Sequence, residues 1–194
     1  MSWSVGESGA LALKAARGAG MSWGQAEEAS FAVRWLQQRG APGVEALANY
    51  LGSYGTESAA ACPLAIGTAL SDTAITPPTE IGMVHQPMLL IPFVASIATN
   101  GPVRLSINDT FIDVFPDHFI TLDTLADITV ATGTVAIIDS PITAFRAPAD
   151  GSSPRVPDTT EPAMANLADL AANTYAPATE ESRAGAGSGM SDND

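Results

Sequence analysis

Residues 81–108, IGMVHQPMLLIPFVASIATNGPVRLSIN, decide how the rest of the chain is organised. The stretch contains the longest apolar run, Met88 to Ala95, and separates a helical N-terminal third from a strand-like second half. A proline inside a helix loses a backbone hydrogen bond and costs about 3 kcal/mol, whereas the first helical position tolerates it. We therefore predict a buried strand over about 83–91 and a helix that begins at Pro92.

This helix is expected to stop at Asn100 and Gly101, because both residues tolerate positive φ. Residues 103–107 then alternate apolar and polar side chains, which is typical of a strand with one solvated face. An alternative for the same stretch is a single helix that begins at Pro87 and is kinked at Pro92. Both interpretations place a buried element here, followed by a strand.

Helices are predicted throughout the first third of the chain. Ser4 and Ser22 each precede a glutamate or glutamine by three residues, which is the spacing of a capping box at a helix N-terminus. We expect three helices, over about 4–18, 23–39 and 42–51. The following segment, residues 59–70, fits either a strand or a buried helix, since a proline and a glycine interrupt its apolar pattern.

The second half reads as a mostly antiparallel sheet. Asn108 and Asp109 form a plausible tight turn, after which residues 111–115 return antiparallel and residues 118–122 add a short strand. Residues 127–131 and 134–139 are rich in Ile, Val and Thr and flank Thr132-Gly133, a pattern that predicts a hairpin.

From residue 147 onward the composition changes to that of a linker rich in Pro, Gly and Ser. A short helix is possible from Pro162, and the last residues lack apolar side chains to bury and are expected to be disordered. The predicted fold class is α+β, with a three-helix N-terminal segment, a mostly antiparallel sheet with a short helix, and a disordered C-terminal tail. The folded domain is expected over 1–146, and 147–194 would hold the linker, the short helix and the acidic tail.

The composition limits the classes of partner. The 194 residues include 46% apolar ones, and 8 basic against 21 acidic residues give a net charge of −13. Binding to a phosphate backbone requires several Lys or Arg contacts, so we expect neither nucleic acid nor an anionic membrane as a partner. The N-terminus lacks the basic start of a signal peptide, and no apolar run approaches the roughly 18–20 residues of a membrane helix. A soluble, cytoplasmic protein is expected.

The run ALKAARGAGMSWGQAEEASFAVRWLQQRG, together with CPLAIGTALSD and PMLLIPFVA, resembles a bacterial family classed as a domain of unknown function. The resemblance covers about residues 1–139 and leaves out the tail. It implies a shared fold, but it brings no activity, no cofactor and no catalytic residues.

The helical stretch is also similar to the N-terminal helices of the malate/L-lactate dehydrogenase family. That family continues with an Asp-Ser-His-Gly motif, whereas here Gly40 is followed by Ala41, Pro42 and Gly43. This departure gives no reason to carry over a nicotinamide site.

The candidate catalytic residues are Cys62, Asp72, Glu80 and His85. Cys62 is the one cysteine, which excludes an intrachain disulfide, and His85 could act as its base in space. Glu80 and Asp72 could join His85 in an acid–base cluster. For each residue a plain structural role is the competing interpretation: a small buried thiol, a loop histidine and solvated carboxylates.

Two classes of function fit these observations. The first is a non-catalytic ligand-binding protein or accessory subunit in small-molecule metabolism, working as a partner subunit of an enzyme or as a homo-oligomer. The second is a small hydrolase, lyase or isomerase that uses Cys62 or His85 with a nearby carboxylate. They are distinguished by whether Cys62, Asp72, Glu80 and His85 converge on one hollow. No cofactor and no metal is expected from the sequence.

Overall fold

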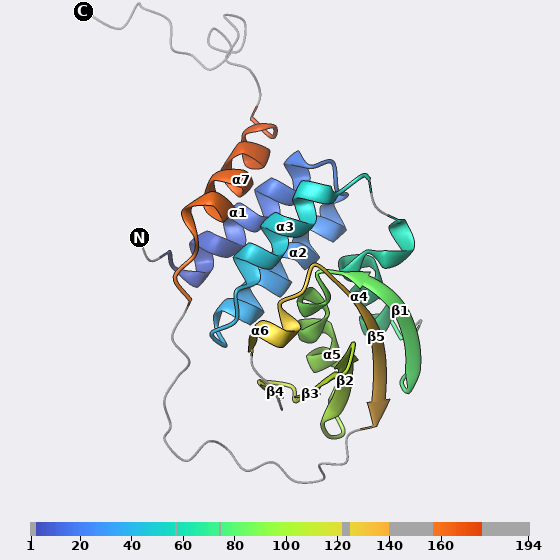
Figure 1. The fold of residues 1–194 in the computed structure, drawn as a ribbon. Helices are drawn as coiled ribbons and strands as arrows, with labels where there is room; N and C mark the ends of the chain where they lie inside the picture. Colours follow the sequence, from blue (N-terminus) through green and yellow to red (C-terminus); the bar gives the residue numbers. More distant parts are fainter. Residues whose placement is uncertain (1–2, 57, 74, 122–124, 140–156, 176–194) are drawn as a thin grey trace, which may run out of the picture.

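The computed structural model describes residues 3–56, 58–73, 75–121, 125–139 and 157–175. Its helical part packs against one face of a five-stranded antiparallel sheet (Figure 1). The predicted α+β class is therefore confirmed. The predicted linker before residue 157 and the predicted disordered tail after residue 175 lie outside the described residues.

The first three helices form where the sequence predicts them: α1 (Val5–Gly18), α2 (Trp23–Gln37) and α3 (Gly43–Ser53). Both capping boxes are present. The backbone N–H of Glu7 donates to the Ser4 hydroxyl over 3.2 Å, and the backbone N–H of Gln25 donates to the Ser22 hydroxyl over 3.3 Å. These side chains satisfy backbone N–H groups that have no partner inside the helix and so fix where α1 and α2 begin.

The ambiguous segment 59–70 is helical. A 3₁₀ turn (Ala59–Ala61) precedes α4 (Pro63–Ser71), and Cys62 occupies the N-cap position. Pro63 stands at the first helical position, where its missing N–H has no cost. Gly67 lets α4 lie against Phe93, because a Cβ on this glycine would come within 2.3 Å of the Phe93 ring. Close packing, and not a break in structure, explains the glycine.

The strand predicted over 83–91 is wrong beyond His85. β1 (Thr79–His85) ends there, and the chain continues as a 3₁₀ turn (Pro87–Leu90) and then as α5 (Ile91–Ile97). The alternative of a helix from Pro87 is therefore closer to the structure. Gln86 has a left-handed backbone with φ 45° and redirects the chain out of the sheet just before the proline.

The sheet contains β2 (Val103–Ile107), β3 (Thr110–Val114), β4 (Phe119–Thr121) and β5 (Thr132–Asp139) beside β1. Its strand order is β1-β5-β2-β3-β4, and every pairing is antiparallel. The turn predicted at Asn108 and Asp109 is confirmed, and Asn108 adopts the positive φ of 51° that such a turn requires.

The hairpin predicted around Thr132-Gly133 is wrong. Both residues lie inside β5, where they pair with His85 and Val84, and the preceding segment contains the short helix α6 (Leu125–Ile128). Gly133 packs so tightly against Ile107 that an added Cβ would lie 2.9 Å from the Ile107 side chain. A glycine inside a strand marks such a close approach as often as it marks a turn.

The inner face of the sheet carries the core, with Leu105, Ile112 and Ile137 fully buried beneath α5. The outer face carries an ion pair between neighbouring strands. Arg104 Nε and Nη2 donate to the two carboxylate oxygens of Asp113 over 2.9 and 2.7 Å, and Asp113 is fully buried. The hydrogen bond to Asp113 raises the pKa of Arg104 above its usual value.

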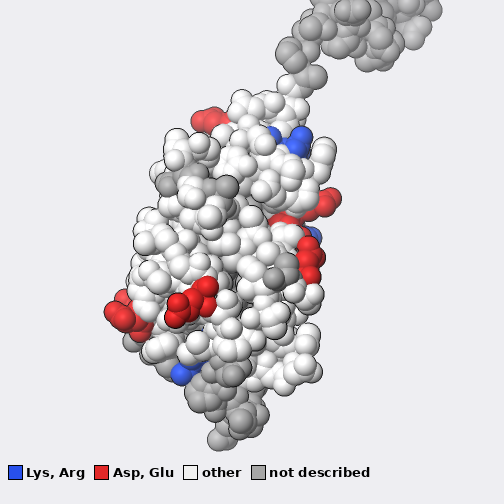
Figure 2. All heavy atoms as spheres, turned by 90° about the vertical axis from the view of Figure 1, so that its right-hand side faces the viewer, with Lys and Arg blue, Asp and Glu red and all other residues white. Residues whose placement is uncertain are grey.

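Charged side chains are sparse on the surface. Figure 2 shows isolated acidic and basic groups on a largely uncharged face, in keeping with a chain in which 15% of residues are charged. The negative net charge therefore does not translate into one broad acidic surface on this face.

The possible C-terminal helix is present as α7 (Glu161–Ala172) and lies along α1 and α3 (Figure 1). Its buried residues are Ala163, Leu167 and Ala171. Since an isolated helix of this length is marginal in water, burial of this face explains why the segment is helical. The domain division at residue 146 stays a prediction, but the helical layer includes α7.

Gly18 permits the contact between α1 and α7. A Cβ on Gly18 would lie 1.7 Å from the carbonyl oxygen of Leu170, a backbone atom that cannot rotate away. We expect Gly18→Ala to push α7 off α1 and to lower the free energy of unfolding by about 1–3 kcal/mol, the usual cost of overpacking. Amide exchange should accelerate across residues 161–172. Gly24→Ala is the matched control, because nothing lies within 4 Å of its added Cβ; unchanged exchange in the Gly18 variant would contradict the prediction.

Candidate functional site

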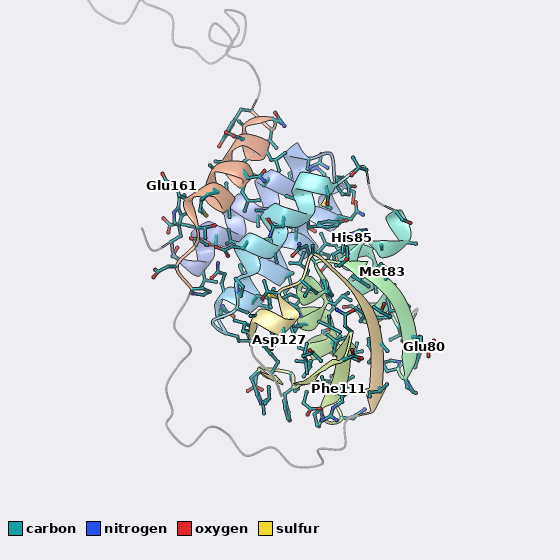
Figure 3. All side chains as sticks on the ribbon, in the orientation of Figure 1. Glu80, Met83, His85, Phe111, Asp127 and Glu161 are labelled. Atoms are coloured by element: carbon teal, nitrogen blue, oxygen red, sulfur yellow. The ribbon has the colours of Figure 1, made fainter. Side chains whose placement is uncertain are left out.

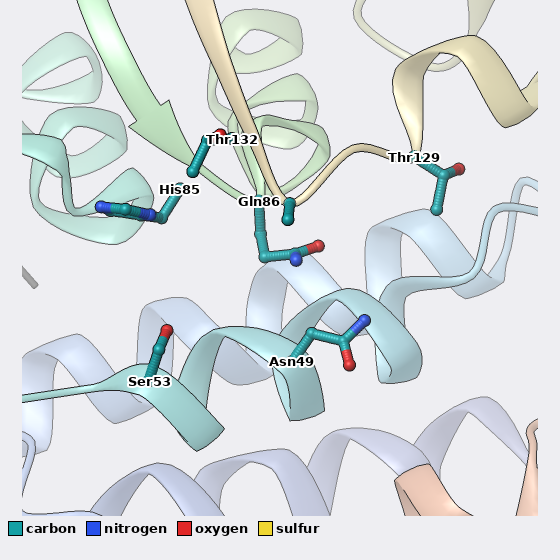
Figure 4. A pocket seen from close by; sticks show the side chains of 7 residues that line it. Asn49, Ser53, His85, Gln86, Thr129 and Thr132 are labelled. Carbon is teal, nitrogen blue, oxygen red and sulfur yellow. The ribbon is translucent and has the colours of Figure 1, made fainter. Parts of the chain in front are cut away.

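A hollow of about 560 Å³ lies where the end of β1 and the start of β5 face helix α3 (Figure 4). The residues that line it come from three parts of the chain: Asn49, Ser53, His85, Gln86, Thr129, Ala131 and Thr132. It lies between the helical part and the sheet, and ligand sites are common at such junctions between packed units.

The turn after β1 shapes this hollow. Gln86 is a non-glycine residue with a left-handed backbone. Its backbone N–H donates to the Ala131 carbonyl over 2.8 Å, and this bond holds the end of β1 against the start of β5. A left-handed backbone costs a non-glycine residue roughly 1–3 kcal/mol, and such strain clusters at ligand-binding and catalytic sites. Figure 4 shows the Gln86 and Asn49 side chains directed into the space between the strand ends and α3.

The lining is polar and uncharged apart from one imidazole. Amide groups come from Asn49 and Gln86 and hydroxyl groups from Ser53, Thr129 and Thr132, and among the described residues no Asp, Glu, Lys or Arg lines the hollow. Amides donate and accept hydrogen bonds and hydroxyls do both as well, so this set matches ligands that carry hydroxyl, carbonyl or amide groups. The described lining offers no carboxylate, ammonium or guanidinium group to pair with a strongly charged ligand.

Of the four candidate catalytic residues, His85 lines this hollow and Cys62 lines another. Cys62 is buried, and its sulfur accepts a hydrogen bond from the Ala65 amide over 3.4 Å at the start of α4. Together with Tyr50 and Tyr54 it lines a smaller hollow of about 210 Å³. The structure thus gives Cys62 a capping role and does not place it in one hollow with His85.

Glu80 and Asp72 are both exposed. Glu80 lies near the far end of β1 from His85 (Figure 3), and five residues of strand separate the two by roughly 17 Å. Asp72 caps the end of α4 and lies near Glu28. The pKa of Glu28 is raised, first by burial and then by the charges of Asp72 and Glu27.

The four candidates therefore do not converge on one hollow, and their catalytic assignment stays a prediction. Within the described ranges, no three His, Cys, Asp or Glu side chains gather closely enough to hold a metal ion. The remaining histidine, His118, bonds through Nδ1 to its neighbour Asp117 over 2.6 Å, and this bond lowers the pKa of Asp117.

The sequence analysis did not identify most residues of the hollow between α3 and the ends of β1 and β5. Asn49 lies on an exposed helix position and Thr129 and Thr132 lie in a segment rich in β-formers, so neither composition nor spacing sets them apart. The proline after Gln86 did not reveal the turn either, because the residue before a proline is biased toward an extended backbone and Gln86 is left-handed.

The fold and the hollow define the chain as an α+β protein with an uncharged polar site between its helical layer and one end of its sheet. Residues 3–76 match the model of a family described as a protein of unknown function, DUF3726. This finding confirms the predicted resemblance to a domain of unknown function over α1 to α4, a shorter span than the 1–139 expected.

No curated protein and no solved structure matches the chain. The similarity to malate/L-lactate dehydrogenases and the bacterial origin accordingly stay predictions. In the described part of the chain, no helix combines the length and the apolar character that crossing a bilayer requires.

Proposed function

We propose that this protein is a non-catalytic binding protein for a small, uncharged polar molecule, held in the hollow between α3 and the ends of β1 and β5. The observation that carries the proposal is the strained turn at Gln86, which directs an amide side chain into a hollow lined by further amide and hydroxyl groups. Strain of this kind persists where the surrounding structure holds a functional geometry.

The proposed setting is small-molecule metabolism in a bacterial cytoplasm, as an accessory subunit of an enzyme or as a homo-oligomer. A catalytic role as a hydrolase, lyase or isomerase has less support. Its nucleophile candidate Cys62 and its base candidate His85 line different hollows, and Glu80 lies at the other end of β1. Nucleophilic catalysis requires the nucleophile and its base within hydrogen-bond reach.

The test is a titration of the ¹⁵N-labelled full chain with neutral polyols, simple amides and, for comparison, acetate and methylammonium. We expect neutral compounds to shift the amide signals of Gln86, Thr129 and Thr132, and the two ions to shift them much less. Asn49→Ala should weaken binding about 2- to 10-fold, the value of one neutral hydrogen bond.

Asn100→Ala is the control, because this asparagine is also exposed and lies in a loop outside the hollow. Equal weakening in the two variants, or shifts confined to other parts of the chain, would exclude the proposed site. Turnover of a bound ester or amide that His85→Ala abolishes would replace the binding proposal with the catalytic one.

A further inference from the structure

A second hollow, of about 460 Å³, lies where the C-terminal ends of α1 and α7 meet the N-terminus of α2. It is lined by Leu13, Lys14, Arg17, Trp23, Asn173 and Thr174. We propose that this hollow binds an anion that carries a flat aromatic ring, with aryl phosphates as the ligand class. The proposal concerns a different surface, and a different ligand chemistry, from the neutral site beside α3.

The charge of this hollow is opposite to that of the chain. The chain has 8 basic residues against 21 acidic ones, yet its one lysine and one of its arginines line the hollow together, and none of the described residues that line it is acidic. Lys14 and Arg17 are three residues apart on α1, so they lie on the same helix face. Among the described residues, neither has a carboxylate within salt-bridge distance, so both charges remain available to an anion.

The Trp23 ring lines the same hollow, and the Tyr175 ring lies beside Lys14, which also lines it. Trp23 and Tyr175 are the most exposed large apolar side chains of the described residues, at 63% and 65%. The Arg17 guanidinium lies 4.8 Å from the centre of the Trp23 ring, and Lys14 Nζ lies 5.7 Å from the centre of the Tyr175 ring. Rings placed beside cations allow one ligand to stack its own ring while its anionic group contacts the two bases.

Close packing fixes the walls of the hollow. The absence of a Cβ on Gly18 brings α7 against α1, and Asn173 Nδ2 donates to the Gly18 carbonyl over 3.3 Å. Arg17 Nη1 donates to the Met21 carbonyl, which anchors the guanidinium and leaves most of its five N–H groups free to bind. The N-terminus of α2 contributes a partial positive charge beside Trp23, and the C-terminal ends of α1 and α7 contribute partial negative charges, so the attraction for an anion rests on the side chains of Lys14 and Arg17.

A purely structural role accounts for part of this arrangement. Cations in the last turn of a helix interact favourably with its dipole, and Arg17 would do so without any ligand. That role does not require the exposed Trp23 ring beside Arg17, nor a hollow in which two bases lie together with no described carboxylate within salt-bridge distance. The combination of cations, rings and a rigid wall is what indicates a ligand.

The test uses the full chain and phenyl phosphate as the probe, with the indole N–H signal of Trp23 as the readout. We expect a saturable shift of this signal, with binding weaker for inorganic phosphate and for phenol, because each supplies one half of the recognised group. Lys14→Gln should weaken binding of phenyl phosphate roughly tenfold, the effect of losing one charge-assisted contact. In Trp23→Ala, where the backbone amide signals of Lys14 and Arg17 replace the indole as the readout, the preference for phenyl phosphate over inorganic phosphate should be lost.

Arg34→Gln is the matched control, since it removes the same charge from an exposed site on α2 that does not line the hollow. Thermal melting would first establish that all three variants fold. A loss in the Arg34 variant equal to that in the Lys14 variant would show general charge attraction and overturn the proposal. The absence of a saturable Trp23 shift would overturn it as well.

Discussion

Arg104→Ala is expected to lower the free energy of unfolding by about 3–5 kcal/mol, because the variant removes the guanidinium that binds both oxygens of the buried Asp113 carboxylate. In the native protein both carboxylate oxygens receive a hydrogen bond from the guanidinium across the β2–β3 pairing. Urea unfolding of the variant and the native chain measures the difference directly.

The double variant Arg104→Met with Asp113→Leu is the control. Apolar replacement of both partners of a buried pair is often neutral or stabilising, so it should recover most of the loss. A single-variant loss below about 1 kcal/mol would mean that the pair behaves like an exposed salt bridge.

Leu90→Ala is expected to cost about 2–5 kcal/mol, the range for truncating a fully buried leucine. Leu90 is completely buried in the turn between β1 and α5, where α2, α3 and α4 all pack nearby. Met83→Ala is the matched control within the same stretch, since Met83 is 56% exposed on β1 and should change stability little. Equal melting temperatures in the two variants would contradict the conclusion that Leu90 contributes to the core.

Much of the helical part could be predicted, because its signals are local. Each capping box spans four residues, and the structure contains both at the predicted serines, Ser4 and Ser22. The β2–β3 turn was predictable for the same reason, since Asn108 tolerates positive φ wherever the strands lie.

The errors concern residues whose role depends on distant neighbours. Gly133 resembles a turn glycine in sequence, but it is a glycine because Ile107, more than twenty residues away, packs against it. Apolar residues after His85 suit a strand or a helix equally, and the strained Gln86 backbone decides between them. The hollow beside α3 was missed because its uncharged polar residues come from separate segments and form no pattern until the chain folds.

The position of β5 in the sheet has a consequence during synthesis. β5 is the last of the described strands to be made, yet it lies between β1 and β2 and is hydrogen-bonded to both. At about 5–20 residues per second, β1 leaves the ribosome roughly 3–10 seconds before β5 can reach it. Contacts among helices α1 to α4 join segments that are close in the sequence and can form before β5 is made, whereas the sheet and the packing of α7 on α1 and α3 depend on distant segments and form later.

Until β5 inserts, the nascent chain exposes the β5-facing edges of β1 and β2, and unpaired edges invite pairing with other chains. The yield of correctly folded protein should therefore depend on how fast residues 132–139 follow and on how many nascent chains lie close together. Slower elongation across residues 86–131 is expected to increase aggregation during expression, even though the finished molecule is unchanged.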